Sequence, residues 1–235
     1  MSAARYLVVN ADDFGRSAGV NRGVVRAYEN GIVTSASLMV RWPDARAAAD
    51  YRKEHPDLGL GLHVDLGEWT RQDQVWRPLY EVCPLDDAKA VRAEVFRQLE
   101  TFRELVGRDP THLDSHQHVH RDSPASAILA RAAEELGVPL RHFAPGIRYC
   151  GDFYGQDGEG RSYPNAIAVE ALVTLLRGLG PGVTELACHP GEDGGLESMY
   201  RCERVQEVEV LCDARVRETL KAEGIELRSF ESLPR

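Results

Sequence analysis

Segments typical of strands and of helices alternate along this chain from one end to the other. Strand-like patterns occupy 6–12, 33–40, 58–66, 112–119, 139–145, 182–190 and 225–230. Helix-like patterns lie between them, at 17–31, 43–56, 86–106, 123–137, 165–180 and near 201–223. Such alternation predicts an α/β fold in which the strands form a parallel sheet covered by helices.

The strand pattern leaves two architectures open: an irregular, seven-stranded (β/α) barrel and an open, doubly wound sheet. No GxGxxG follows the first strand, which weakens a dinucleotide-binding interpretation. The 235 residues contain no internal repeat and no Pro/Gly/Ser-rich linker, so we expect a single domain over 1–235. In both architectures the ligand site lies at the carboxyl ends of the strands.

Composition narrows the function classes. The net charge of -9 argues against a nucleic-acid partner. No run of 18 apolar residues predicts a membrane span, and the first 15 residues do not resemble a signal peptide. Five cysteines without a CxxC pair fit reduced thiols in a cytoplasmic protein. We therefore expect a cytoplasmic protein with a small-molecule partner; its oligomeric state stays open, with a homodimer among the options.

Histidines and aspartates gather where the predicted strands end. Four strands contribute to this set, which comprises Asp12, Asp13, His63, Asp65, the segment 112–120 and His189. Polar residues often end strands by chance, but four strands doing so with these residue types indicates a functional rim. The strand-end rule predicts that these side chains converge.

The segment HLDSHQHVH (112–120) holds four of the 8 histidines. If it is a strand, its even-numbered residues share one face, because side chains alternate. Fully extended, nine residues span about 30 Å, so at most two neighbouring side chains could reach one ion. His112 begins the segment and fits the scaffold, whereas the others could bind metal, orient a ligand or contact substrate.

The adjacent residues Asp12 and Asp13 should divide two tasks, one binding a metal and the other acting as a base or an anchor. The following Phe14-Gly15 turn could bring both carboxylates to one site. An Asp/His/His set suits a catalytic divalent cation with an open position for water. Its ligands favour zinc or a similar transition metal over calcium without excluding magnesium or manganese.

Four motifs, NADDFG (10–15), GLHVDL (61–66), HLDSHQHVH (112–120) and ACHPG (187–191), resemble those of the YdjC-like carbohydrate deacetylases. This family includes chitooligosaccharide deacetylases and hopanoid-biosynthesis-associated deacetylases. The motifs follow in order over nearly the whole chain. The resemblance implies a distorted (β/α) barrel related to polysaccharide deacetylases, and an enzyme that removes acetyl groups from N-acetylated amino sugars with one divalent cation, magnesium or zinc.

Carried over residue by residue, the resemblance assigns the metal positions to Asp13, His63 and His116. It assigns the general base to Asp12 and, by analogy with a late histidine of related deacetylases, the general acid to His189. The attacking water would lose a proton to Asp12, and His189 would protonate the departing amine. The remaining site residues, Asp114, His118, His120, Trp69 and Tyr154, are expected to support ligands or bind substrate.

The loops leave the substrate open among oligosaccharides, glycolipids and other glycosides. Trp69 and Trp76 follow the third strand in what we expect to be a polar loop, where they could stack on sugars. Tyr154 lies in a long glycine-rich loop, 146–164. Two other classes of function remain possible: a metal-dependent phosphoesterase or glycoside hydrolase on a similar barrel, and a non-catalytic sugar-binding protein.

Overall fold

The computed structural model describes residues 4–192 and 196–233. Its main sheet has seven strands. Six of them follow the order β6-β3-β2-β1-β8-β7, and the seventh, β9, pairs with β1. Every pairing in this sheet is parallel. The strands are β1 (Arg5–Phe14), β2 (Ser35–Leu38), β3 (Gly59–Val64), β6 (Leu113–Ser115), β7 (Ile147–Cys150), β8 (Gly182–Cys188) and β9 (Ile225–Leu227).

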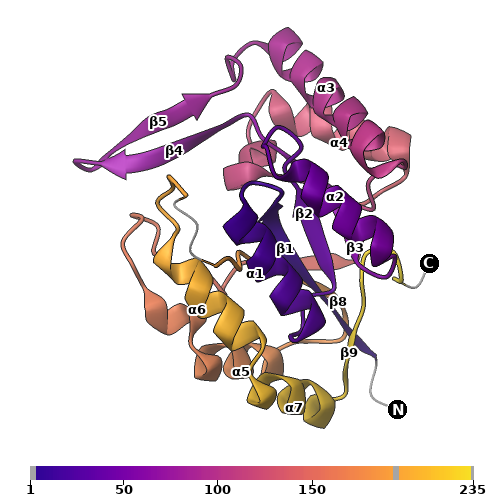
Figure 1. The fold of residues 1–235 in the computed structure, drawn as a ribbon, viewed down its shortest axis with the longest axis vertical. Coiled ribbons are helices and arrows are strands. Elements are labelled where there is room, and N and C mark those ends of the chain that lie inside the picture. The colour runs from indigo at the N-terminus through magenta and orange to yellow at the C-terminus, as the bar shows by residue number, and fades with distance from the viewer. Residues whose placement is uncertain (1–3, 193–195, 234–235) are drawn as a thin grey trace.

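Helices surround this curled sheet, as Figure 1 shows. They are α1 (Ala18–Glu29), α2 (Ala45–Glu54), α3 (Ala88–Val106), α4 (Ala125–Leu136), α5 (Val169–Arg177), α6 (Cys202–Leu211) and α7 (Ala214–Glu223), with 3₁₀ helices η1 (His116–Arg121) and η2 (Pro164–Ile167). In the described chain the two end strands, β6 and β7, do not pair with each other. The fold is therefore an irregular (β/α) barrel that stays open at one seam, which confirms the predicted class.

Local sequence explains where the best-predicted helices begin and end. The Ser17 hydroxyl accepts a hydrogen bond from the Val20 amide and caps α1. The Asp87 carboxylate caps α3 in the same way, and Gly107 ends it with a φ of 82°. The apolar face of α3 is buried as its spacing predicts, through Val91, Val95, Leu99 and Phe102.

The prediction of a polar loop after the third strand is wrong, because the chain forms a two-stranded antiparallel hairpin there. Strands β4 (Gly67–Gln72) and β5 (Val75–Glu81) are joined by Asp73 and Gln74, both with positive φ. Figure 1 shows this hairpin projecting from the body of the molecule. Most of β5 is exposed, so burial did not impose the alternating pattern that would have predicted a strand.

The predicted strand 139–145 is also wrong. Leu140 makes only an isolated bridge to Leu113, and the chain then turns at His142, whose φ is 68°. The strand that joins β8 is instead β7, at Ile147–Cys150, inside the segment predicted to be a loop. The single helix predicted near 201–223 is in fact two helices. The first ends at Cys212, and the second begins after Asp213, whose side chain caps it.

The fourth strand is shorter than predicted. It ends at Ser115, and His116 begins the 3₁₀ helix η1. Gln117 and His118 have φ values of 48° and 57°, so the backbone turns sharply. The Ser115 hydroxyl stabilises this turn by accepting the His120 amide hydrogen at 2.9 Å. The prediction that His116, His118 and His120 share one strand face with Asp114 is therefore wrong.

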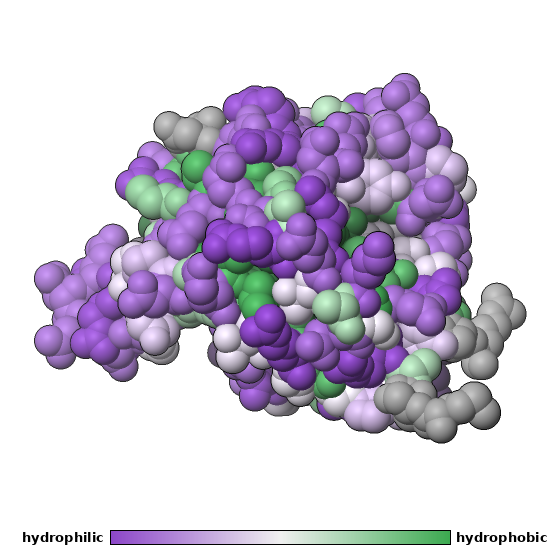
Figure 2. Space-filling model, turned by 90° about the horizontal axis from the view of Figure 1, so that it is seen from below, coloured by the Kyte–Doolittle hydropathy of each residue, from purple (hydrophilic) through white to green (hydrophobic). Residues whose placement is uncertain are grey.

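The face in Figure 2 is mostly hydrophilic: the most hydrophobic residues lie in recesses between polar ones, and a few weakly hydrophobic residues reach the surface. Within the ranges that the structure describes, no helix combines the length and the apolar character needed to cross a membrane.

Gly23 sets how closely α1 approaches the segment after β8. A Cβ added at Gly23 would lie 2.3 Å from the Gly191 Cα, a backbone atom that cannot swing aside. We expect Gly23→Ala to lower the free energy of unfolding by about 1 to 3 kcal/mol. Urea denaturation measures this change. Gly178→Ala is the matched control, since its Cβ would meet nothing nearer than 3.4 Å, and an equal loss there would contradict the packing argument.

Candidate active site

The carboxyl ends of the parallel strands bring the predicted polar residues to one cavity of about 610 Å³. Asp12 and Asp13 come from β1, His63 from β3, and His189 directly follows β8. These four line the cavity together with His116 at the start of η1. The convergence predicted by the strand-end rule is confirmed for these five residues. It is wrong for Asp65, which does not line the cavity and instead accepts hydrogen bonds from Arg41 and Tyr80.

A change of backbone direction at Asp13 separates the two neighbouring carboxylates. Asp13 has a φ of 66°, in the left-handed region, and the strand register shifts between Ala11 and Phe14. As a result the Asp13 carboxylate faces His63 and His116, whereas that of Asp12 faces Arg141. The predicted division of labour thus has a geometric basis, at Asp13 itself rather than in the turn after it.

Asp13, His63 and His116 form a set of buried donor atoms suited to one cation. Asp13 Oδ1 lies 3.0 Å from His116 Nδ1 and 3.4 Å from His63 Nε2. Ligand atoms bonded at about 2.1 Å to one ion lie about 3.0 to 3.4 Å apart. Asp13 Oδ1 is buried yet has no hydrogen-bond partner among the described residues. An orphaned carboxylate oxygen beside two imidazole nitrogens fits a metal position.

Neighbouring groups hold two of these side chains, His63 and Asp13, in place. His63 Nδ1 donates to Asp114 Oδ1 at 2.7 Å, which leaves Nε2 free to bind. Arg204 occupies the other oxygen of Asp13. Burial alone would lower the pKa of His63, but the carboxylates of Asp114 and Asp12 raise it to about 10. The site therefore attracts positive charge strongly.

Asp12 is held by the buried guanidinium of Arg141 through two hydrogen bonds of 2.6 and 2.7 Å. The same guanidinium lies 2.9 Å from Asp114 and 2.7 Å from Glu185. Burial would raise the pKa of Asp12, but Arg141 outweighs it and lowers that pKa. Asp12 is thus ionised and fixed in one orientation, as a proton acceptor at the cavity wall requires.

His189 lies across from Asp12, with Nε2 3.7 Å from Asp12 Oδ2. Its ring centroid lies 5.3 Å from that of Tyr154, in a T-shaped contact, and 5.4 Å from that of Tyr200, in a tilted one. Its backbone amide donates to Glu207, which fixes the segment. Burial lowers the pKa of His189 to about 4, so the ring is neutral near pH 7 in the cation-free protein.

The predicted supporting residues separate into two groups. Trp69, Tyr154 and His118 line the cavity, and Asp114 lies behind His63. His120 turns away and does not line it. The backbone of Trp69 exchanges two hydrogen bonds of 2.8 Å with the Gln117 side chain, which ties the hairpin to the turn after His116.

Sequence reasoning missed the buried charges around the site: Glu68, Arg141, Glu185, Arg204 and Glu207. Arg141 could have been noticed as a charge inside a segment predicted to be a buried strand. Arg204 and Glu207 lie on α6, whose charged residues carry no pattern separating buried from exposed ones. Only the fold reveals that Arg141 joins three carboxylates from three strands.

The family model described as YdjC-like protein matches residues 6–222. A carbohydrate deacetylase of Geobacillus stearothermophilus is 34% identical over 96% of this chain and 97% of its own length. A chitooligosaccharide deacetylase of Salmonella paratyphi B is 32% identical over 96% and 98%.

Two solved structures share the fold. A candidate cellobiose-phosphate cleavage protein from Enterococcus faecalis V583 is 25% identical, with a TM-score of 0.78 over 99% of this chain and 100% of that one. A family 4 carbohydrate esterase from Streptomyces lividans, solved with acetate, has a TM-score of 0.56 at 13% identity over 96% and 93%. The second likeness concerns the fold alone.

Proposed function

The chain belongs to the YdjC-like protein family, and on that premise we propose that it is a metal-dependent hydrolase that removes the acetyl group from an N-acetylated amino sugar. The names of its two curated relatives, a carbohydrate deacetylase and a chitooligosaccharide deacetylase, support the reaction class. Zinc and magnesium are the cations we propose.

One observation carries the proposal: the buried Asp13/His63/His116 set, Asp12 and His189 all face the same cavity. A deacetylase needs a Lewis acid, a base for water and an acid for the amine within reach of one carbonyl. Binding a sugar without catalysis would not require a buried Asp12 carboxylate paired with Arg141, next to an Asp13 oxygen that has no hydrogen-bond partner in the described chain.

Asp13, His63 and His116 would hold the cation. When bound there, a divalent cation lowers the pKa of water and polarises a carbonyl group. Asp12 accepts a proton from the water that attacks the amide carbon. Arg141 keeps the Asp12 carboxylate ionised and aimed at the cavity.

His189 delivers a proton to the amine nitrogen as the C–N bond breaks. Because its ring is neutral before reaction, we propose that the proton comes from the attacking water through Asp12, across the 3.7 Å gap between Asp12 Oδ2 and His189 Nε2. Water then supplies the hydroxyl to acetate and the hydrogen to the amine. The two groups end the cycle as they began.

Aromatic side chains around the cavity suit a sugar. Trp69, Trp76, Tyr149, Tyr154 and Tyr200 contribute to its lining. Aromatic faces provide apolar contact to sugar rings, while their polar atoms can hydrogen-bond hydroxyl groups. Trp76 is 47% exposed on β5, so we propose that it meets the part of the substrate furthest from the acetyl group.

An acetate-release screen tests the function. We expect N-acetylated mono- or oligosaccharides to release acetate in the presence of Zn²⁺ or Mg²⁺, with loss of activity after chelation. Because one solved structure of this fold is named for cellobiose-phosphate cleavage, the screen includes a phosphorylated disaccharide and an aryl phosphate. Release of phosphate or of a monosaccharide, without acetate from any N-acetyl sugar, would favour the phosphoesterase or glycoside hydrolase alternative.

The single domain over 1–235, the cytoplasmic location, the homodimer option and the absence of a nucleic-acid partner stay predictions. Gel filtration and fractionation of cells address the oligomer and the location directly.

A further inference from the structure

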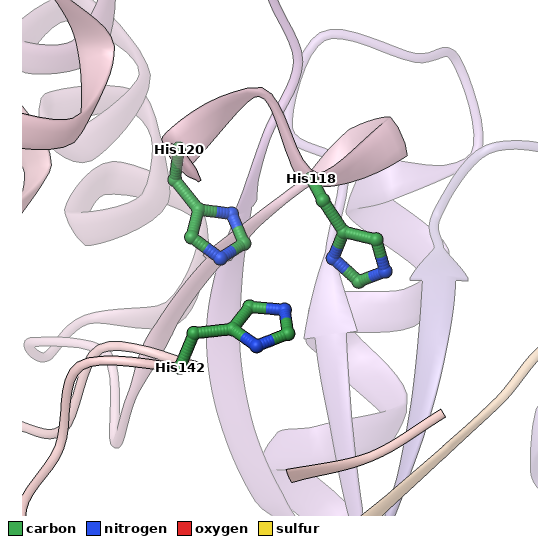
Figure 3. A group of neighbouring side chains, drawn as sticks. All are labelled: His118, His120 and His142. Atoms are coloured by element: carbon green, nitrogen blue, oxygen red, sulfur yellow. The ribbon is translucent and has the colours of Figure 1, made fainter. Parts of the chain in front are cut away.

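A second group of histidines lies beside the cavity. His118 and His120 from η1 meet His142 from the segment that follows α4, and Figure 3 shows the three rings turned toward a common space. One nitrogen atom from each ring lies within 4.8 Å of those of the other two. None of the three belongs to the Asp13/His63/His116 set.

Two of the rings have one nitrogen engaged and the other free. His120 Nδ1 lies 2.6 Å from the Ser115 hydroxyl, and its buried Nε2 has no partner in the described chain. His118 Nε2 lies 3.2 Å from the Tyr149 hydroxyl, and its buried Nδ1 is likewise unpartnered. Anchoring one imidazole nitrogen while the other stays free is the usual arrangement of metal-binding histidines.

The backbone is strained at two of the three histidines. His118 and His142 have φ values of 57° and 68°, a region that residues other than glycine rarely adopt. Such strain persists where the surrounding structure or a function maintains it. The turn at Gln117 and His118 also sends His116 to the first site and His118 and His120 to this one.

The charges around the three histidines are compatible with a bound cation. Arg141 and Arg121 would repel it, whereas Asp12 and Asp114 would attract it. Arg141 is itself paired with Asp12, Asp114 and Glu185. Burial lowers the pKa of His120 and of His142 to about 4, so both rings are neutral and able to bind a metal near pH 7.

We propose that His118, His120 and His142 form a second metal site, for a transition-metal ion such as Zn²⁺. Three neutral imidazoles suit Zn²⁺, Cu²⁺ or Ni²⁺ and disfavour Mg²⁺ and Ca²⁺, which prefer oxygen ligands. Three protein ligands leave a fourth position open. This inference rests on its own residues and does not depend on the deacetylase reaction.

The test counts Zn²⁺ ions per chain by elemental analysis after equilibration with Zn²⁺ and removal of the excess. We expect two ions in the natural protein and one in His142→Asn, because asparagine tolerates a positive φ but removes the imidazole. His118→Asn, at the other positive-φ position, should lose the same ion. His55→Asn, which changes a histidine remote from both sites, should keep two.

A triple variant, with Asp13, His63 and His116 all changed to Ala, separates this site from the first. It should retain one Zn²⁺, and adding His142→Asn should remove it. Unchanged Zn²⁺ content in both His142→Asn and His118→Asn would overturn the proposal, whatever the first site binds. Thermal unfolding identifies any variant that fails to fold, and the exposed position of His142 makes that variant the least disruptive.

Discussion

The Asp12→Asn variant is expected to lose deacetylation by a factor of about 10² to 10⁴ while it keeps the cation held by Asp13, His63 and His116. The amide of asparagine has nearly the shape of the carboxylate but cannot accept a proton from water. Asp12 is not one of the three proposed metal ligands, and its oxygens accept hydrogen bonds from Arg141 and Asn10. Turnover should therefore fall, with metal content unchanged.

A structural side effect must be separated from the loss of a base. The asparagine NH₂ group would face an Arg141 donor, and such a mismatch inside the protein costs about 1 to 3 kcal/mol. Glu185→Gln is the matched control, because Glu185 accepts from the same guanidinium at 2.7 Å but does not line the cavity. It should lose stability and keep activity within a few-fold.

The measurement compares kcat, KM, metal content and urea denaturation for both variants. A large fall in kcat for Asp12→Asn alone supports the base. If Asp12→Asn retains most of its kcat, Asp12 is not the base. If both variants lose kcat equally, the effect comes from disturbing Arg141 and the assignment of Asp12 is likewise wrong.

The regular part of the fold could be predicted because its signals are local. Helix caps at Ser17 and Asp87 and the apolar spacing of 91–102 act within a few residues, and the strands buried on both faces are rich in apolar residues. The strand-end rule then placed Asp12, Asp13, His63 and His189 at one edge without any knowledge of strand order. Motif and topology agreed on the same residues.

The predictions that failed concern features that depend on contacts between segments far apart in the sequence. After Ser115 the fourth strand gives way to a turn that Gln117 ties to the backbone of Trp69, 48 residues earlier, while the Ser115 hydroxyl accepts the His120 amide hydrogen within the turn. An alternating HxHxH pattern gives no sign of either contact. The buried ion-pair partners Arg141 and Arg204 were missed for the same reason, since Arg141 pairs with Asp12, 129 residues away along the chain, and Arg204 with Asp13, 191 residues away.

The second large effect concerns His116, whose replacement by alanine should remove the cation from the Asp13/His63 set together with deacetylation. One of three protein ligands disappears, and the pair that remains cannot define the ion's position. Changing a residue that only orients a ligand costs about 10 to 100-fold in metal affinity, so Asp114→Asn, which disturbs His63, serves as the graded comparison. His116→Ala should exceed that loss.

Elemental analysis and titration with Zn²⁺ measure both variants, with His55→Ala as the control for a histidine outside the site. Relative to the natural protein we expect one ion fewer in His116→Ala, weakened binding in Asp114→Asn and no change in His55→Ala. Removing the metal from the natural protein with a chelator should abolish activity, and adding it back should restore activity there but not in His116→Ala. An unchanged ion count in His116→Ala would show that Asp13, His63 and His116 do not form a metal site.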